Sequence, residues 1–274
     1  MQKSLGERLW ACTVWTLVGF FILNLLAMIA SVVVDSFGRR WFNTWLPSGY
    51  TAQWYALAWD EFGLPSILLV TLEVVGATVL LSGLLGVPAA YAMARRNFPG
   101  KRAVMLLFLL PLLVPPITYG IPLATVLYQA HLAGTIWGVI LANLVPSLPF
   151  VILIMIPFVE QIDPRVESAA RVFGARMGRL FTRVLVPLLT PGILAALLLV
   201  LVRTIAMFEL TFLTAGPTSQ TLVVALYYAV FAAGVRPQQS IDAMAVVYMI
   251  TTLVWLLIAL RFVNPSQIVT RAKR

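Results

Sequence analysis

The sequence predicts an all-α, polytopic membrane protein with six transmembrane helices and both termini in the cytoplasm. Of its 274 residues, 61% are hydrophobic and only 11% are charged, whereas a soluble domain carries about a quarter charged residues. The apolar residues form stretches that reach the roughly 20 residues a helix needs to cross a bilayer. In order, these spans are expected at 11–33, 67–92, 103–128, 137–158, 190–213 and 241–262. One transmembrane domain over 1–274, with its core at about 67–262, accounts for the whole chain.

The positive charges are concentrated on one side of this arrangement. The segments 1–10, 93–102, 159–189 and 261–274 face the same side and hold 15 of the 19 basic residues. Because cytoplasmic loops carry an excess of lysine and arginine, these segments, and with them both termini, are assigned to the cytoplasm. The formal net charge of +9 is therefore a topology signal and argues against nucleic-acid binding. The 15 residues are Lys3, Arg8, Arg95, Arg96, Lys101, Arg102, Arg165, Arg171, Arg176, Arg179, Arg183, Arg261, Arg271, Lys273 and Arg274.

The first span is expected to be a retained helix. The stretch 11–33 is longer than the core of a typical signal peptide, and no small-x-small cleavage site follows it. Cys12 is the single cysteine, which excludes a disulfide framework and a cysteine metal site. His131 is the single histidine and is expected in a short external loop. The sequence therefore predicts no metal and no cofactor in this chain.

The segment 34–66 is the longest on the external side. It is rich in aromatic residues, including Trp45, Trp54, Tyr55 and Trp59. Aromatic side chains at this density beside a membrane commonly lie at the level of the lipid headgroups. The segment is expected to be an interfacial amphipathic element, and contact with an external partner protein is the alternative.

Prolines interrupt two neighbouring spans. The span at 103–128 contains four prolines, and the span at 137–158 contains three. Such helices must break or kink. Backbone carbonyls freed at membrane depth are tolerated only when they are buried in protein or line a watery cavity. The two spans therefore indicate the lining of a transport pathway, with purely structural kinks as the alternative.

Ionisable and polar side chains inside the spans are candidate pathway residues. Charged groups are costly in a membrane and are functional-site candidates by default. Two interpretations stay open: Glu73 pairs with Arg203 across helices, or Glu209 lines the pathway and attracts cationic cargo. The candidate pathway residues are Glu73, Thr118, Tyr119, Asn143, Ser147, Arg203, Phe208 and Glu209.

The largest cytoplasmic segment, 159–189, has helix signals of its own. Asp163 followed by Pro164 is typical of a helix start, with the aspartate as N-cap and the proline at the first helical position. Gly174 is a plausible stop about two turns later. A second short helix is expected at 176–184, with its arginines on one face toward phospholipid headgroups.

A longer pattern covers the same segment. The run Glu167-Ser-Ala-Ala-Arg-Val-Phe-Gly174 is followed, after nine residues, by Val-Leu-Val-Pro187. This resembles the EAA signature of ABC importer permeases, E-A-A-x3-G-x9-I-x-L-P. In register with Gly174 and Pro187, the two alanines are Ala169 and Ala170, Ser168 stands at the glutamate position directly after Glu167, and valines replace isoleucine and leucine. The resemblance implies a type I permease fold in which this coupling helix docks in a groove of a cytoplasmic ATPase. The residues it assigns to ATPase coupling are Glu167, Ser168, Ala169, Ala170, Arg171, Phe173, Gly174 and Pro187.

Four further features resemble the second permease of spermidine/putrescine-type systems: the region from Asn43-Thr44-Trp45 to Trp54-Tyr55, the run Arg95-Arg96-Asn97-Phe98-Pro99-Gly100, Pro115-Pro116 and Gly216-Pro217. This resemblance implies a bacterial inner membrane as location and favours a polyamine-like cation as cargo. Iron, phosphonate, organic acid and sugar permeases share several of these features, so those cargoes stay open. The resemblance also implies four kinds of partner: a cytoplasmic ATPase dimer, a second permease that forms a heterodimer with this one, a periplasmic solute-binding protein and membrane lipid.

The sequence contains no catalytic or nucleotide-binding motif. It has no G-x-x-x-x-G-K-[ST], no H-E-x-x-H and no serine or cysteine catalytic constellation. The chain is therefore not expected to be an enzyme, and ATP and magnesium would be bound by the partner ATPase. An ion-coupled secondary transporter is the alternative of a different class, but the two halves show no convincing internal repeat of the kind such folds often carry.

Overall fold

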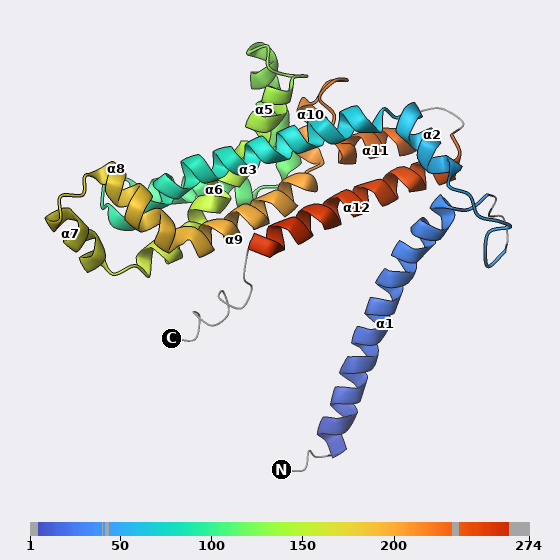
Figure 1. The fold of residues 1–274 in the computed structure, drawn as a ribbon, viewed down its shortest axis with the longest axis horizontal. Helices are drawn as coiled ribbons and strands as arrows, with labels where there is room; N and C mark the ends of the chain where they lie inside the picture. The colour runs from blue at the N-terminus through green and yellow to red at the C-terminus, as the bar shows by residue number, and fades with distance from the viewer. Residues whose placement is uncertain (1–4, 40, 42–43, 232–235, 263–274) are drawn as a thin grey trace. The chain divides into compact units, whose positions relative to one another are not determined.

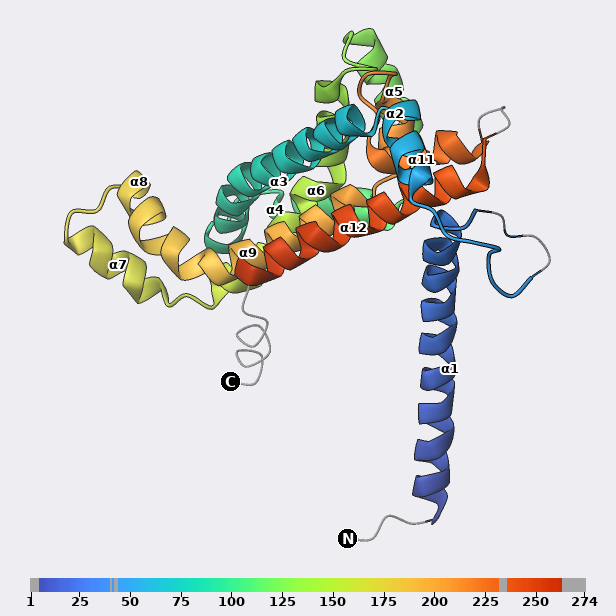
Figure 2. The same cartoon turned by 45° about the vertical axis from the view of Figure 1, so that its right-hand side comes forward.

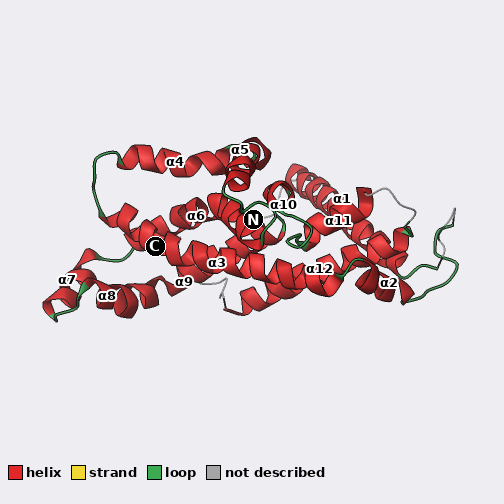
Figure 3. Ribbon diagram, turned by 90° about the horizontal axis from the view of Figure 1, so that it is seen from above, coloured by secondary structure: helices red, strands yellow, loops and turns green. Residues whose placement is uncertain are grey.

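The computed structural model describes residues 5–39, 41, 44–231 and 236–262. Helices make up nearly all of it (Figure 3). Within the described residues, the β-type contact is an isolated bridge between Gly38 and Tyr50. The predicted all-α class is confirmed.

The elements are α1 (Leu5–Ser36), α2 (Gln53–Glu61), α3 (Leu64–Arg95), α4 (Lys101–Leu113), α5 (Pro116–Gln129), α6 (Ile136–Glu160), α7 (Pro164–Val172), α8 (Met177–Leu180), the π-helix η1 (Phe181–Leu185), α9 (Val186–Ile205), α10 (Glu209–Thr214), α11 (Leu222–Phe231) and α12 (Gln238–Phe262).

Several of these helices are long and apolar enough to cross a membrane. The described residues contain five such helices, and a sixth span results if the bent pair α4 and α5 counts as one. The multi-pass architecture is therefore confirmed. The cytoplasmic location of the termini stays a prediction. Four residues used to assign it lie outside the described residues: Lys3, Arg271, Lys273 and Arg274.

The proline-rich third span is two helices. α4 and α5 meet at an angle of 104°. Val114 between them is extended, with φ −86° and ψ 135°, as expected for a residue that precedes a proline. Neither Pro115 nor Pro116 has an N–H group to continue the hydrogen-bond ladder of α4. The predicted break in this span is confirmed.

The fifth span begins earlier than predicted. A continuous helical segment runs from Met177 to Ile205, so the start at residue 190 and the separate helix at 176–184 were wrong. In an α-helix, the ring of Pro187 would clash with the carbonyl group four residues earlier. The π-helix Phe181–Leu185 lies immediately before this proline, and its wider turn accommodates the ring without ending the helix.

The same span also ends earlier than predicted. α9 stops at Ile205 and α10 begins at Glu209, so a single helix over 190–213 was wrong. The N–H of Met207 bonds to the carbonyl of Thr204 at 3.2 Å, a three-residue spacing that tightens and closes the last turn. Phe208 and Glu209 therefore lie at a break between two helices.

The described chain forms two compact units. Unit 1 comprises Met1–Leu64 and Tyr228–Met249, and unit 2 comprises Pro65–Tyr227 and Ile250–Arg274. In unit 2, α6 packs against α4, α9 and α10. In Figures 1 and 2, α7 and α8 lie at one end of this unit, and α5 and α10 lie at the other. The main core of unit 2 joins α3, α6 and α9 through Val87, Tyr91, Val151, Ile152, Met155, Leu189 and Val200.

In unit 1, hydrogen bonds join α2 to the end of α1 and to the residues that directly follow it. The hydroxyls of Tyr55 and Ser36 lie 2.8 Å apart, and the indole N–H of Trp54 donates to the carbonyl of Gly38 at 2.7 Å. Trp45, in the loop before α2, is 97% exposed. The external aromatic segment therefore has exposed aromatic surface, and its contact with headgroups or with a partner protein stays a prediction.

Candidate functional site

The helix α7 is closed at both ends by its own residues. The side chain of Asp163 accepts a hydrogen bond from the N–H of Arg165 at 2.8 Å. Gly174 has a left-handed φ of +78°. The N–H of Ala175 bonds to the carbonyl of Ala170 at 3.0 Å, which is the long hydrogen bond of a Schellman motif. The predicted start and stop of this helix are both confirmed.

The two faces of α7 differ sharply in exposure. Glu167 is only 7% exposed, and Ala170 packs against the core of unit 2. In contrast, Val172 and Phe173 are 85% and 89% exposed, and Val166 is 40% exposed. Adjacent, highly exposed apolar side chains beside a charged inward face indicate a contact surface.

The buried carboxylate of Glu167 is bound on both oxygens. One oxygen accepts from the Nε of Arg95 at 2.8 Å, and the other accepts from the hydroxyl of Tyr91 at 2.6 Å. Arg95 also donates to the carbonyl of Ile162 at 2.5 Å. The ring of Tyr91 meets that of Phe181 edge-on, with centroids 6.0 Å apart. Glu167 thus joins α7 to the end of α3.

The sequence analysis did not identify Tyr91 and Arg95 as hydrogen-bond partners of Glu167. Their spacing of four residues places them on the same face at the end of α3, which is a weak signal. The contact spans more than 70 residues of chain, so no local pattern could have identified it.

The other predicted coupling residues are placed around the same helix. Ser168 and Ala169 are exposed, and the hydroxyl of Ser168 donates to the carbonyl of Pro164 at 3.2 Å. Arg171 is exposed, and its guanidinium lies close to the hydroxyl of Tyr91. Pro187 does not belong to α7 and lies in the first turn of α9.

At the other end of unit 2, a second group of predicted residues meets where α5, α6 and α10 pack together. Asn143 is 1% exposed. Its amide nitrogen donates to the carbonyl of Val139 at 2.9 Å and to the hydroxyl of Thr211 at 3.3 Å. Its amide oxygen has no hydrogen-bond partner among the described residues, and the same is true of the buried hydroxyl of Tyr119. Ser147 is buried one turn further along α6.

The charged candidates are arranged differently from the prediction. Among the described residues no ion pair joins Glu73 and Arg203, so the structure does not support the first of the two open interpretations. Glu73 lies on the exposed face of α3, whereas the Arg203 guanidinium lies 5.3 Å from the ring centroid of Phe150. A cation over an aromatic face is stabilised by the ring quadrupole. Arg203 and Glu209 both lie within electrostatic range of Tyr119. Thr118 is exposed.

Phe208 belongs to an aromatic cluster beside the helix break. Its ring centroid lies 5.2 Å from that of Phe212 and 4.9 Å from that of Tyr227. All three residues are half-buried. The structure therefore brings Tyr119, Arg203, Phe208 and Glu209 to one end of unit 2, and it leaves Glu73 outside this group.

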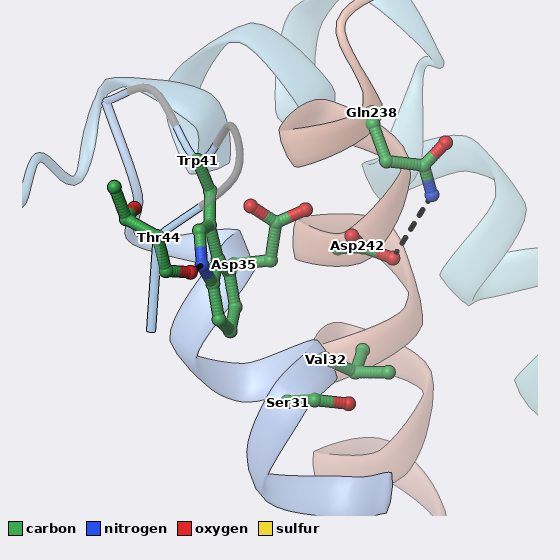
Figure 4. A pocket seen from close by; sticks show the side chains of 7 residues that line it. All are labelled: Ser31, Val32, Asp35, Trp41, Thr44, Gln238 and Asp242. Atoms are coloured by element: carbon green, nitrogen blue, oxygen red, sulfur yellow. Dashed lines mark hydrogen bonds between the residues drawn. The ribbon is translucent and has the colours of Figure 1, made fainter. Parts of the chain in front are cut away.

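Unit 1 contains a separate polar hollow of about 430 Å³, which the sequence did not predict (Figure 4). The carboxylates of Asp35 and Asp242 lie within hydrogen-bonding range of each other. The amide of Gln239 donates to Asp35 at 3.4 Å, and the amide of Gln238 donates to Asp242 at 3.3 Å. The lining residues are Ser31, Val32, Asp35, Trp41, Thr44, Gln238 and Asp242.

Known proteins resemble this chain over much of its length. It is 30% identical over 200 residues to the putative molybdenum transport system permease protein YvgM of Bacillus subtilis, covering 67% of this chain and 84% of that one. It is 37% identical over 125 residues to the trehalose transport system permease protein SugB of Mycobacterium tuberculosis, covering 46% of each chain. It is 36% identical over 152 residues to the probable sulfate transport system permease protein cysT of Chlorokybus atmophyticus, covering 51% and 53%. The matches thus span about half the length of the last two relatives.

Solved structures share the fold at low sequence identity. A chain of a bacterial ABC transporter involved in the import of the acidic polysaccharide alginate matches with a TM-score of 0.81 and 17% identity, covering 96% of this chain and 100% of that one. A chain of the MetNI methionine ABC transporter matches with a TM-score of 0.55 and 17% identity, covering 74% and 95%.

The family match covers α7 and agrees with the membrane-spanning architecture. The sequence model described as "Binding-protein-dependent transport system inner membrane component" matches residues 83–268. This range contains α7, the bent pair α4 and α5, and the helix break beside Glu209. The chain belongs to the family of binding-protein-dependent transport system inner membrane components.

Proposed function

We propose that this chain is a permease subunit of an ATP-driven ABC importer, which moves a small polar solute delivered by a periplasmic binding protein. In this proposal α7 docks on a separate cytoplasmic ATPase dimer, and the residues where α5, α6 and α10 meet line the translocation pathway. The chain itself performs no ATP hydrolysis.

The observation that carries the proposal is the surface of α7. Its caps hold it as a short independent helix, and it presents Val172 and Phe173 almost fully exposed. Exposed apolar side chains next to one another, on an element of the predicted cytoplasmic side, fit a protein partner better than a solvated face. The match of the EAA pattern to the same residues supports an ATPase as that partner.

The proposed pathway lies at the other end of unit 2. Helix breaks separate α4 from α5 and α9 from α10. In a membrane protein, breaks of this kind are tolerated where the backbone is buried in protein or lines a watery cavity. The half-buried cluster of Phe208, Phe212 and Tyr227 fits one wall of such a path. A second permease subunit, in our proposal a paralogue of this one, would supply the opposite wall.

The cargo is proposed only as a small polar solute. A polyamine-like cation stays a prediction and depends on Glu209 facing the pathway. The relatives named above are permeases of molybdenum, trehalose and sulfate systems, so an oxyanion or a sugar is a second candidate. Arg203, near the same break, would attract an anion as Glu209 would attract a cation.

The test is purification of the chain from its own host in mild detergent, followed by reconstitution in liposomes. We expect an ABC ATPase and a second permease to co-purify, and we expect uptake to require ATP and the binding protein. Phe173→Ala should reduce the co-purified ATPase about tenfold, because one well-placed apolar anchor contributes this much to many interfaces. Uptake by the chain alone, driven by an ion gradient, would contradict the proposal.

Met177→Ala is the matched control. Met177 is also apolar and 45% exposed, and it lies just beyond the end of α7. We expect this variant to retain the ATPase. Equal loss from both variants would mean that general instability, and not contact through α7, explains the result.

A further inference from the structure

The buried carboxylate of α7 is bound by the helix bundle of unit 2. Both carboxylate oxygens of Glu167 are engaged by α3, through Arg95 at 2.8 Å and Tyr91 at 2.6 Å. Tyr91 is 5% exposed and Glu167 is 7% exposed. A carboxylate that is buried and already bound on both oxygens is not presented to a docking ATPase in this conformation.

The same cluster joins four elements. Arg95 also donates to the carbonyl of Ile162, in the turn between α6 and α7. The ring of Tyr91 packs edge-on against Phe181 of the π-helix. The end of α3, the α6–α7 turn, α7 and the start of the fifth span therefore converge on three side chains, Tyr91, Arg95 and Glu167. We name these three the clamp.

Two other polar side chains of the α7 segment bond within the segment, whereas the guanidinium of Arg171 lies close to the hydroxyl of Tyr91. Asp163 bonds to the N–H of Arg165, and Ser168 bonds to the carbonyl of Pro164, both within the segment itself. Ala170 makes an apolar contact with the core. Glu167 accepts charge-assisted hydrogen bonds from α3, and such bonds are stronger than neutral ones.

Water cannot easily replace either partner of the Arg95–Glu167 ion pair, because both side chains are largely buried. The side chains of Arg95 and Glu167 are 17% and 9% exposed. Removing one partner of a buried pair leaves the other charge uncompensated, which is strongly unfavourable. Loss of Arg95 should therefore release Glu167, and with it α7, from the end of α3.

We propose that Tyr91 and Arg95 are positioning residues that couple α7 to α3, so that displacement of α7 by the ATPase moves α3 as one body with it. The proposal rests on the proposed function, because it requires α7 to be the element that the ATPase moves. It adds the route by which that displacement enters the membrane: through the last turn of α3, which runs along unit 2 toward the end where α10 lies (Figure 1).

The experiment uses the complete importer in liposomes and measures solute taken up per ATP hydrolysed. Arg95→Ala should keep the ATPase bound, because Arg95 lies behind α7, and should lower this ratio about fivefold or more, the scale of a typical coupling free energy. Tyr91→Phe should lower it less, since it removes one hydroxyl. Arg95→Lys should restore part of the ratio by returning the charge without the planar fork.

Arg96→Ala is the matched control, since Arg96 is the next residue along the chain and is exposed. It should leave the ratio unchanged. An intact complex of Arg95→Ala with the wild-type ratio would overturn the clamp. If Arg95→Ala does not assemble, Tyr91→Phe decides: a wild-type ratio in that variant overturns the clamp, and a lowered ratio supports it. Failure of the wild-type chain to bind any ATPase would instead overturn the proposed function.

Discussion

Gly216 lies directly against the backbone of Gly134. A Cβ built on Gly216 would come within 2.9 Å of both the Cα and the carbonyl oxygen of Gly134. The hydroxyl of Ser219 holds the contact, since it donates to the carbonyl of Gly134 at 2.9 Å and accepts from the N–H of Gly216 at 2.8 Å. The loop before α6 and the loop after α10 are therefore locked together backbone to backbone.

Gly216→Ala should destabilise unit 2 by about 1–3 kcal/mol, because the new methyl group meets backbone that cannot move aside as a side chain would. The measurement is the apparent melting temperature of the purified protein in detergent. Gly76→Ala is the control: no atom lies within 4 Å of a Cβ at that position, so this variant should melt at or slightly above the wild-type temperature.

Gly174→Ala should weaken the coupling of ATP hydrolysis to transport while the protein still folds and assembles. The φ of +78° at this position costs a residue with a Cβ about 1–2 kcal/mol, although no neighbouring atom would be struck. We expect lower binding-protein-stimulated ATPase activity in assembled complexes. Gly174→Asn should be milder, because asparagine tolerates the left-handed conformation. Normal transport and normal stimulated activity in Gly174→Ala would contradict a coupling role for this turn.

Asp163→Ala should loosen the first turn of α7 by about 1 kcal/mol, the usual value of a helix N-cap. Hydrogen exchange of the backbone amides of 165–168 measures this directly, and exchange should be faster in the variant. Asp163→Ser, which keeps an oxygen acceptor, should exchange nearly as slowly as the wild type. Identical exchange in Asp163→Ala would mean that packing against the core alone holds this helix.

Glu209→Gln should reduce uptake while the complex stays assembled, if the cargo is cationic and passes the helix break between α9 and α10. Uptake and complex recovery are measured together. Glu160→Gln removes a charge from an exposed site at the end of α6 and should have no effect. Unchanged uptake in Glu209→Gln would remove this residue from the pathway and would favour an anionic or neutral cargo.

Local signals predicted the parts of this fold that depend on local chemistry. Asp163, Pro164 and Gly174 bound a short helix because a cap, a fixed φ and a left-handed turn act on their immediate neighbours. The break near Pro115 follows from missing N–H groups in the same way. These elements needed no knowledge of the rest of the molecule.

The errors arose where packing between distant segments decides the structure. Pro187 looked like a boundary, yet a π turn carries the helix through it. The break before Glu209 occurs in an apolar run with no proline or glycine between Val200 and Leu213. Opposite charge offered Glu73 as a partner of Arg203 in one of two interpretations, whereas the guanidinium of Arg203 lies over the ring of Phe150. The binding of Glu167 to Arg95 likewise depends on how α3 and α7 meet in space.

The angle of 104° between α4 and α5 has a lasting consequence. Straightening this elbow would place two consecutive prolines inside one helix, where both lack a donor and both crowd the preceding turn. The bend therefore follows from the covalent structure of two adjacent prolines. α4 has 13 residues and at 1.5 Å per residue reaches about 20 Å, too short to cross the hydrocarbon layer alone. A crossing of that layer by this segment therefore needs both helices of the bent pair.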